Sequence, residues 1–246
     1  MFFKGINHYG DLGLILDFGS DSSQQISQEV NAVYALLQDL DLPQLNIIPS
    51  FNKIVLAFQS GKDRNQAQDA IEHNLAKADL KNPQKDRIYW NIPACYEDSY
   101  ALDRELIQAT HGLSKEEVIS KHTSTSYYAY YIGFMPGFPY LGDIDSSLIT
   151  PRLATPRIQI PARSIGIAKE HTCVYPKVSP GGWNIIGQVP FDIFSLEHSR
   201  TSLFLPGDTV QFQSISEKEF LQIHSCLLYT SPSPRDYAAS RMPSSA

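Results

Sequence analysis

The stretch that begins at Tyr131 and runs to about Gly187 constrains this chain most. It places glycine and proline at short intervals among aromatic residues and arginines. Its three densest parts read YIGFMPGFPYLGD, TPRLATPRIQIPARSIGIA and VYPKVSPGGWNIIG. Glycine reaches backbone conformations that other residues avoid, and proline fixes φ and removes a hydrogen-bond donor. The stretch therefore predicts short strands joined by tight turns that together form a surface of defined shape, rather than an ordinary hydrophobic core.

Composition excludes several classes of protein. A chain of 246 residues with 42% hydrophobic content can form one large domain or two small ones. The net charge of −6 and the absence of a dense Lys/Arg run argue against nucleic-acid binding. No apolar run approaches the roughly 20 residues that a membrane span needs, and the N-terminus does not resemble a signal peptide. The three scattered cysteines predict neither a disulfide framework nor a metal site, so we expect a cytoplasmic protein.

The first 92 residues predict one α/β domain. Two helices with apolar residues at helical spacing lie among four short runs rich in β-forming residues, and Asp63 is the expected cap of the second helix. The order strand–helix–strand–strand–helix–strand is the split βαβ arrangement of ferredoxin-like folds. The predicted elements, in order, are strand 12–18, helix 26–40, strands 45–48 and 54–58, helix 63–78 and strand 87–92.

Gly61-Lys62-Asp63 is not a phosphate-binding loop. A Walker motif needs glycine five residues before Gly61 and a hydroxyl residue after the lysine, but the chain has Leu56 and Asp63 there. We interpret the triplet as a helix start.

Residues 93–222 predict a second, β-rich domain with leading helices. The first helix spans 99–110, and Ser114 and Glu117 form a capping box at the start of the next. A strand over 127–132 and many short β-rich runs between Gly/Pro turns then predict a barrel or sandwich.

Residues 226–246 form a Ser/Pro-rich tail that we expect to be non-native or disordered. Its first eleven residues, 226–236, can be back-translated into the adapter of transposase-based sequencing libraries.

The motifs between 131 and 187 resemble the carboxyltransferase subdomain C/D family, and the resemblance covers about residues 8 to 222. It implies an α+β protein, in which a ferredoxin-like domain precedes a cyclophilin-like β-barrel. Family members include the B subunit of 5-oxoprolinase, the Kip-type inhibitor of a sensor histidine kinase, and allophanate hydrolase subunit 1.

The resemblance implies an ATP-dependent amide hydrolase that is not active alone. As the B subunit of a 5-oxoprolinase, the chain would act with the C and A subunits on the lactam 5-oxo-L-proline to give L-glutamate. ATP would bind this chain or a partner. Two alternatives stay open: inhibition of a sensor histidine kinase, and the carboxyltransferase part of a urea carboxylase/allophanate hydrolase system.

Phe134, Pro136, Gly137 and Phe138 predict one wall of a pocket, with aromatic faces and close backbone approach to a ligand. The alternative is a rigid turn packed against the barrel.

Arg152 and Arg157 end two Thr-Pro-Arg repeats in one extended segment. Two guanidinium groups on a stiff segment suit carboxylate or phosphate recognition, or a subunit interface. Ordinary surface ion pairs are the alternative.

The run Ser179-Pro180-Gly181-Gly182-Trp183 predicts a second part of the site. Two glycines can leave consecutive N–H groups free for an anion, and Trp183 offers an apolar face. A turn anchored by a buried tryptophan is the alternative. By resemblance, Ser164 and Tyr175 join these candidates, with Tyr175 shaping the pocket floor.

His122 matches a histidine-threonine pair of the family. It is a possible acid/base, with a helix-capping role as the alternative; His171 and Tyr175 are further proton-handling candidates. Arg163 and Lys169 stand where the family commonly has glycine, which predicts a reshaped rim. Cys173 is expected to be a buried filler.

Overall fold

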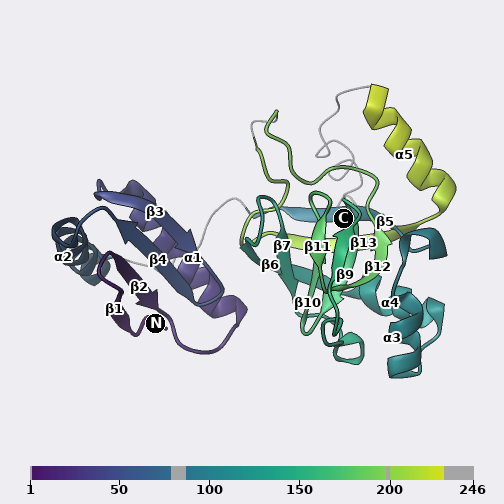
Figure 1. The fold of residues 1–246 in the computed structure, drawn as a ribbon, viewed down its shortest axis with the longest axis horizontal. Coiled ribbons are helices and arrows are strands. Elements are labelled where there is room, and N and C mark those ends of the chain that lie inside the picture. Colours follow the sequence, from purple (N-terminus) through teal and green to yellow (C-terminus); the bar gives the residue numbers. More distant parts are fainter. Residues whose placement is uncertain (1, 79–86, 198–199, 230–246) are drawn as a thin grey trace, which may run out of the picture. The chain divides into compact units, whose positions relative to one another are not determined.

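The computed structural model of the protein describes residues 2–78, 87–197 and 200–229. The chain divides into two compact units, residues 1–87 and 88–246 (Figure 1). Each unit has a hydrophobic core of its own. Among the described residues, no helix has both the length and the apolar character that crossing a membrane requires.

The first unit is an antiparallel sheet with the strand order β1-β2-β4-β3, packed against two helices. Alternation places Leu14, Leu16, Ile54 and Leu56 on the buried face, where they meet the apolar stripes of both helices. Its elements are β1 (Gly5–Tyr9), β2 (Gly13–Asp17), α1 (Gln24–Asp39), β3 (Gln44–Pro49), β4 (Lys53–Phe58) and α2 (Gly61–Lys77).

Two sequence predictions for this unit are wrong. The strand predicted over 87–92 does not close this sheet; β1 occupies the edge beside β2, and residues 89–95 belong to the second unit. Alternating apolar residues mark a strand but do not say which sheet the strand joins. Helix α2 is capped by Ser60, whose hydroxyl accepts the Asp63 N–H, so Asp63 lies in the first turn instead of at the cap.

The second unit is a closed barrel with the strand order β10-β7-β6-β13-β5-β12-β9, which confirms the predicted barrel. Strands β5 and β13 are parallel, and the other neighbouring pairs are antiparallel. A separate pair, β8 with β11, lies outside the barrel sheet. The strands are β5 (Tyr89–Cys95), β6 (Ser126–Ile132), β7 (Pro139–Gly142), β8 (Arg157–Ile160), β9 (Ser164–Ala168), β10 (His171–Val174), β11 (Ser179–Gly181), β12 (Asn184–Gln188) and β13 (Thr209–Ile215).

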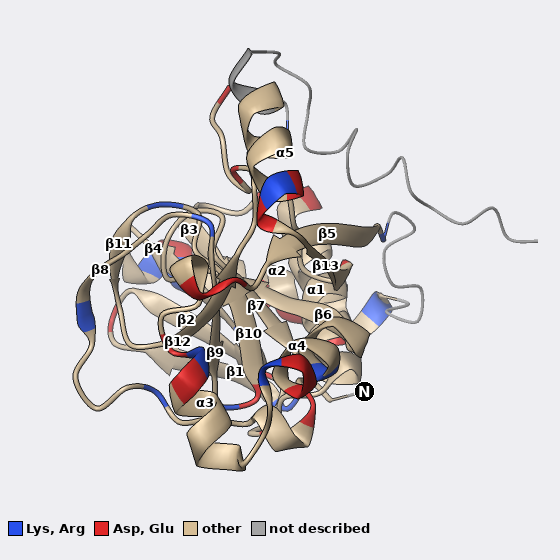
Figure 2. Cartoon of the chain, turned by 90° about the vertical axis from the view of Figure 1, so that its right-hand side faces the viewer, with Lys and Arg blue, Asp and Glu red and all other residues tan. Residues whose placement is uncertain are grey.

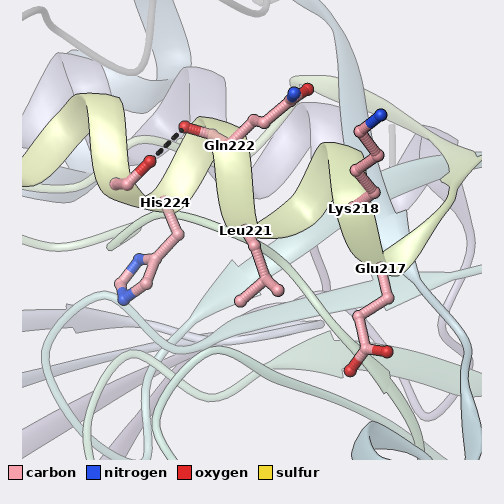
Figure 3. A pocket seen from close by; sticks show the side chains of 6 residues that line it. Glu217, Lys218, Leu221, Gln222 and His224 are labelled. Atoms are coloured by element: carbon pink, nitrogen blue, oxygen red, sulfur yellow. Dashed lines mark hydrogen bonds between the residues drawn. The ribbon is translucent and has the colours of Figure 1, made fainter.

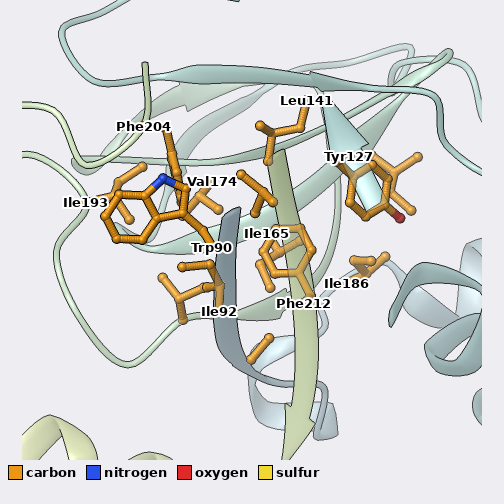
Figure 4. Close-up of a cluster of buried hydrophobic side chains, with 14 of the residues drawn as sticks. Trp90, Ile92, Tyr127, Leu141, Ile165, Val174, Ile186, Ile193, Phe204 and Phe212 are labelled. Atoms are coloured by element: carbon orange, nitrogen blue, oxygen red, sulfur yellow. The ribbon is translucent and has the colours of Figure 1, made fainter. Parts of the chain in front are cut away.

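The barrel is filled by large apolar side chains from most of its strands (Figure 4). Trp90 is 1% exposed, and its indole N–H donates to the Asp208 carboxylate at 3.0 Å. Asp208 also accepts the N–H groups of Ile88 and Leu205 and pairs with Arg200 at 2.6 Å. This buried carboxylate therefore fastens the start of β5 to the turn before β13.

Three helices accompany the barrel: α3 (Arg104–His111), α4 (Lys115–Ser124) and α5 (Glu217–Tyr229). The capping box of Ser114 and Glu117 is confirmed. The helix predicted from residue 99 begins at Arg104, after a 3₁₀ turn over 98–100, and ends at Gly112 with φ 66°. Helix α5 was not predicted, and it includes the first residues of the predicted tail; residues 230–246 lie outside the described part.

Candidate functional site

Three segments far apart in the sequence bring their aromatic side chains together. Phe138 lies just before β7, Tyr175 follows β10, and Trp183 precedes β12. The Phe138 ring is 5.1 Å from Tyr175 and 5.7 Å from Trp183, both edge-to-face, and Tyr140 lies 5.2 Å from Phe138. We call these four residues the aromatic cluster. Such contacts bury large areas and fix ring orientation.

The loop before β7 positions Phe138 by its backbone shape. Phe134 and Gly137 both have positive φ, 71° and 79°. A Cβ on Gly137 would lie 2.6 Å from the Cβ of Phe194, so close packing as well as conformation requires glycine there. Phe134 is 62% exposed, with its ring 5.4 Å from Phe138, and Pro136 is also exposed. The loop thus presents an exposed aromatic edge beside the buried cluster.

Gly181 is required by its contact with Tyr175. A Cβ at Gly181 would lie 2.4 Å from the Tyr175 hydroxyl, whereas one at Gly182 would meet only ordinary contacts at 3.6 Å. Neither glycine has the positive φ that an αR–αL anion nest uses. This geometry favours close packing around Tyr175 over the anion-accepting concavity that the sequence suggested.

The two candidate arginines have different surroundings. Arg157 donates two hydrogen bonds to the buried Asp103 carboxylate, at 2.8 and 2.6 Å. Arg152 is exposed, with its guanidinium carbon 6.0 Å from the centre of the Trp183 ring. Arg157 is thus held in a structural ion pair, while Arg152 places a cation at the edge of the aromatic cluster.

Ser164 and Ser179 are both buried. The Ser164 carbonyl accepts the Tyr175 N–H at 2.9 Å, so β9 holds the backbone of the tyrosine in place. The Ser179 hydroxyl has no hydrogen-bond partner among the described atoms. Neither serine has a histidine among its hydrogen-bond partners in the described residues, so we assign neither as a nucleophile.

Burial controls the ionisation of the tyrosines. Desolvation raises the pKa of Tyr175 far above its ordinary value, and a backbone hydrogen bond from Trp183 opposes the shift only in part. Burial also raises the pKa of Tyr140, although the Arg152 charge lowers it. Both phenols are therefore neutral at pH 7 and can act as hydrogen-bonding groups.

His122 is fully buried in the barrel. Its Nδ1 lies 2.8 Å from the Tyr96 hydroxyl, and its Nε2 lies 3.0 Å from the Thr172 hydroxyl. Burial lowers its pKa to about 3, so the ring is neutral at pH 7. A neutral histidine with both nitrogens satisfied is a core residue, and this placement gives no support to the acid/base role or to a charged helix cap.

His171 lies nearer to the cluster. Its ring is 6.2 Å from Tyr140 and 6.1 Å from Tyr130, both edge-to-face, and it is partly exposed. Burial lowers its pKa, and the charges of Glu170 and Asp143 partly oppose that shift. His171 is therefore the histidine at the rim of the aromatic cluster.

Arg163 and Lys169, the two positions where the family commonly has glycine, adopt a backbone conformation that favours glycine. Their φ angles are 68° and 52°, in the left-handed region. Arg163 extends toward His224 of α5, with its Nη1 2.9 Å from the His224 Nδ1. Cys173 is 0% exposed and burial raises its pKa well above the ordinary value, in accord with a filler role.

Other possible sites are weaker. Within the described residues no group of three His, Cys, Asp or Glu could hold a metal ion. A hollow of about 640 Å³ beside α5 is lined by residues of that helix alone, so it lacks a second wall (Figure 3). The α2 N-terminus does not fit a triphosphate, because Ser60 caps it and the Asp63 carboxylate lies in its first turn.

Sequence reasoning missed two residues that hold the site. Asp103 read as an ordinary polar position in a helix, yet it is 6% exposed and binds Arg157 and the Ile185 N–H. Phe194 packs on Gly137 from a segment with no motif of its own. No local pattern marked Asp103, because its role depends on Arg157, which lies 54 residues later in the chain.

Comparison with known proteins identifies the family of this chain. The sequence profile of the carboxyltransferase domain, subdomain C and D, matches residues 4–204. The chain belongs to this family. It is 33% identical to the 5-oxoprolinase B subunit of Bacillus subtilis (strain 168), over 87% of this chain and 94% of that protein. It is 35% identical to the 5-oxoprolinase B subunit of Escherichia coli O157:H7, over 76% and 85%.

Solved structures share the fold. TTHA0988 aligns with a TM-score of 0.70 and 28% identity, over 82% of this chain but only 39% of that longer chain. The uncharacterized protein PH0987 from Pyrococcus horikoshii aligns with a TM-score of 0.53 and 31% identity, over 87% and 99%. The Kluyveromyces lactis urea carboxylase, at 16% identity and a TM-score of 0.68, shows the fold alone.

Proposed function

We propose that this chain is the B subunit of a 5-oxoprolinase, which acts with the C and A subunits to hydrolyse 5-oxo-L-proline to L-glutamate with ATP. The similarity to two proteins of that name over most of their length supports the assignment. As one subunit of the complex, the chain would bind and orient the substrate. We expect it to be inactive alone.

The observation that carries the proposal is the position of Arg152 beside Trp183 and Tyr140. The substrate is a small, flat lactam ring that bears one carboxylate. An aromatic face suits the ring, and a guanidinium group suits the carboxylate through charge-assisted hydrogen bonds. The structure offers both within one rim, since Arg152 lies 6.0 Å from the Trp183 ring and Trp183 lies 5.7 Å from Tyr140.

Nucleotide binding is assigned to a partner in the complex. The only glycine-lysine pair of the chain begins α2, where a side-chain cap and a carboxylate occupy the first turn. The chain's own residues would hold the lactam: Arg152 would bind the carboxylate, and the neutral Tyr140 phenol would donate to the ring carbonyl.

The test is ATP-dependent release of glutamate from 5-oxoproline by this chain co-expressed with the A and C subunits. We expect turnover that needs all three proteins. Arg152→Ala should reduce kcat/KM by about 10- to 100-fold, as expected for one hydrogen bond to a charged group, about 1.5–3 kcal/mol. Arg152→Lys should keep part of the rate, because the charge remains.

Lys218→Ala is the control, since it removes an exposed cation of the same unit, on α5, that is not one of the rim residues. An assembled complex that turns over equally well without this chain would contradict the proposal. Full activity of the complex that contains the Arg152→Ala variant would contradict the proposed contact between Arg152 and the substrate carboxylate.

A further inference from the structure

The β8–β11 pair has an open edge. β8 (Arg157–Ile160) pairs with β11 and with no second strand in the described part of the chain. An unpaired edge presents backbone N–H and C=O groups that another extended segment can bond. Ile158 at the middle of this strand is 92% exposed. A β-branched apolar side chain this exposed on an edge strand is a feature of interaction surfaces.

A groove of about 520 Å³ lies at the end of this strand pair, where Gln159 and the turn after β8 line it; Ile158 is not among its lining residues. Exposed apolar side chains stand along it, with Leu102 50% and Val178 53% exposed. Its walls come from β8, the turn after it, the residue before β11 and the end of β12; the lining residues are Leu102, Gln159, Pro161, Ala162, Arg163, Val178 and Gln188. None of them belongs to the aromatic cluster, so the groove is a separate surface.

The groove lies in a basic part of an acidic chain. Between Thr150 and Pro190 there are five Lys or Arg residues and a single acidic one, Glu170, although the whole chain has a net charge of −6. Arg163 lines the groove, and the exposed Lys177 is next to Val178. Figure 2 shows basic segments on the loops beside β8 and β11. This local charge attracts carboxylates.

We propose that this groove binds an extended segment of a partner polypeptide in which apolar residues alternate with acidic ones. The segment would pair its backbone with the open edge of β8. Because side chains alternate along a strand, its apolar side chains would lie on the face of Ile158, and its carboxylates, on the opposite face, would lie over the groove toward Arg163 and Lys177. Strand addition obtains affinity from main-chain bonds and specificity from alternate side chains. The inference goes beyond the proposed function and does not depend on it.

The probe is a short fluorescein-labelled peptide of alternating valine and glutamate, with binding to the full chain measured by fluorescence anisotropy. We expect saturable binding that weakens at least tenfold between low and physiological salt. Ile158→Asp and Lys177→Glu should each weaken binding at least tenfold. Leu196→Asp, at an 80% exposed position of the same unit outside the groove, and Lys218→Glu on α5 are the matched controls and should bind as wild type.

Three results would overturn the proposal. The first is no saturable binding at millimolar peptide, and the second is binding that Ile158→Asp and Lys177→Glu leave unchanged. The third is a concentration-dependent dimer of the chain that Ile158→Asp abolishes in sedimentation, since a second copy would then be the occupant. Hydrogen exchange adds a direct readout, because bound peptide should protect the amides of residues 157–160. A peptide with alternate N-methylated residues should give no such protection.

Discussion

The Asp103 carboxylate and the Arg157 guanidinium meet in a two-point ion pair, with N–O distances of 2.8 and 2.6 Å. One of the carboxylate oxygens also accepts the Ile185 N–H at 2.7 Å. Asp103 is 6% exposed, whereas the Arg157 side chain is 30% exposed. The pair ties the β8–β11 sheet to β12 and to the start of α3, and so holds the segment that carries Gly181 and Trp183.

Asp103→Asn is expected to destabilise the second unit by about 2–3 kcal/mol. Breaking a buried pair leaves an uncompensated charge, but the partly exposed Arg157 keeps some contact with water, so the loss should be at the lower end of the known range. Urea unfolding followed by tryptophan fluorescence measures it, because both tryptophans of the chain, Trp90 and Trp183, lie in the second unit.

Arg152→Ala serves as the control and should stay within about 0.5 kcal/mol of wild type, as surface substitutions usually do. In a double-mutant cycle, Asp103→Asn with Arg157→Gln should show coupling of at least about 1 kcal/mol. Purely additive losses would mean that the two side chains act independently.

Local structure was predicted well where one short pattern decides it. The Ser114–Glu117 capping box forms because both partners lie within one turn. Strands β3 and β4 form at the two β-rich runs that predicted strands over 45–48 and 54–58. Strand membership was not predictable in the same way: residues 89–95 alternate like any strand, but their partner β13 lies more than a hundred residues later.

The candidate site shows the same division. The sequence motifs named Phe138, Tyr175 and Trp183 as candidates, and the fold brings their rings together. The motifs could not separate Arg152 from Arg157, because the difference depends on Asp103, which is distant in sequence. His122 was equally ambiguous, since only the closed barrel determines that its ring is inaccessible.

His122 should make the barrel sensitive to acid. Its pKa is about 3 in the folded protein and near 6.5 when unfolded, so the unfolded chain binds the proton more tightly between these values. Stability is therefore greatest above pH 6.5 and falls as the pH decreases. From pH 6.5 to 5 the loss from this group should be about 1.5 kcal/mol. Urea unfolding at each pH measures it.

His122→Gln isolates this contribution. The free energy of unfolding of this variant at pH 7 should be lower, because packing against Tyr127 and Phe212 changes. Between pH 6.5 and 5, however, the variant should lose about 1.5 kcal/mol less of its free energy of unfolding than the wild type does. Asp17, Asp98 and Asp145 have lowered pKa values and lose their contribution only at more acidic pH. Equal slopes in both proteins would show that His122 is not the group responsible.

Lys169→Gly is expected to stabilise the protein by about 0.5 kcal/mol. Lys169 has φ 52°, and left-handed backbone costs a residue with a Cβ about 1–2 kcal/mol. Glycine removes that strain, against an entropic loss of about 0.5–1 kcal/mol. Lys169→Ala keeps the Cβ and should give no gain in the urea midpoint. A lower midpoint for the glycine variant would show that the lysine side chain contributes more than its backbone costs.

Gly181→Ala should destabilise the second unit by about 1–3 kcal/mol, as overpacking a tight site does. The added Cβ would lie 2.4 Å from the Tyr175 hydroxyl and 2.9 Å from the Ile160 Cδ1. Gly182→Ala is the matched control and should be nearly neutral, because its nearest contacts are at 3.6 Å. Tyr175→Phe removes the clashing oxygen, so the double variant Gly181→Ala/Tyr175→Phe should recover part of the loss in thermal unfolding. Equal effects at both glycines, or no recovery in the double variant, would show that the Tyr175 hydroxyl does not determine the residue at 181.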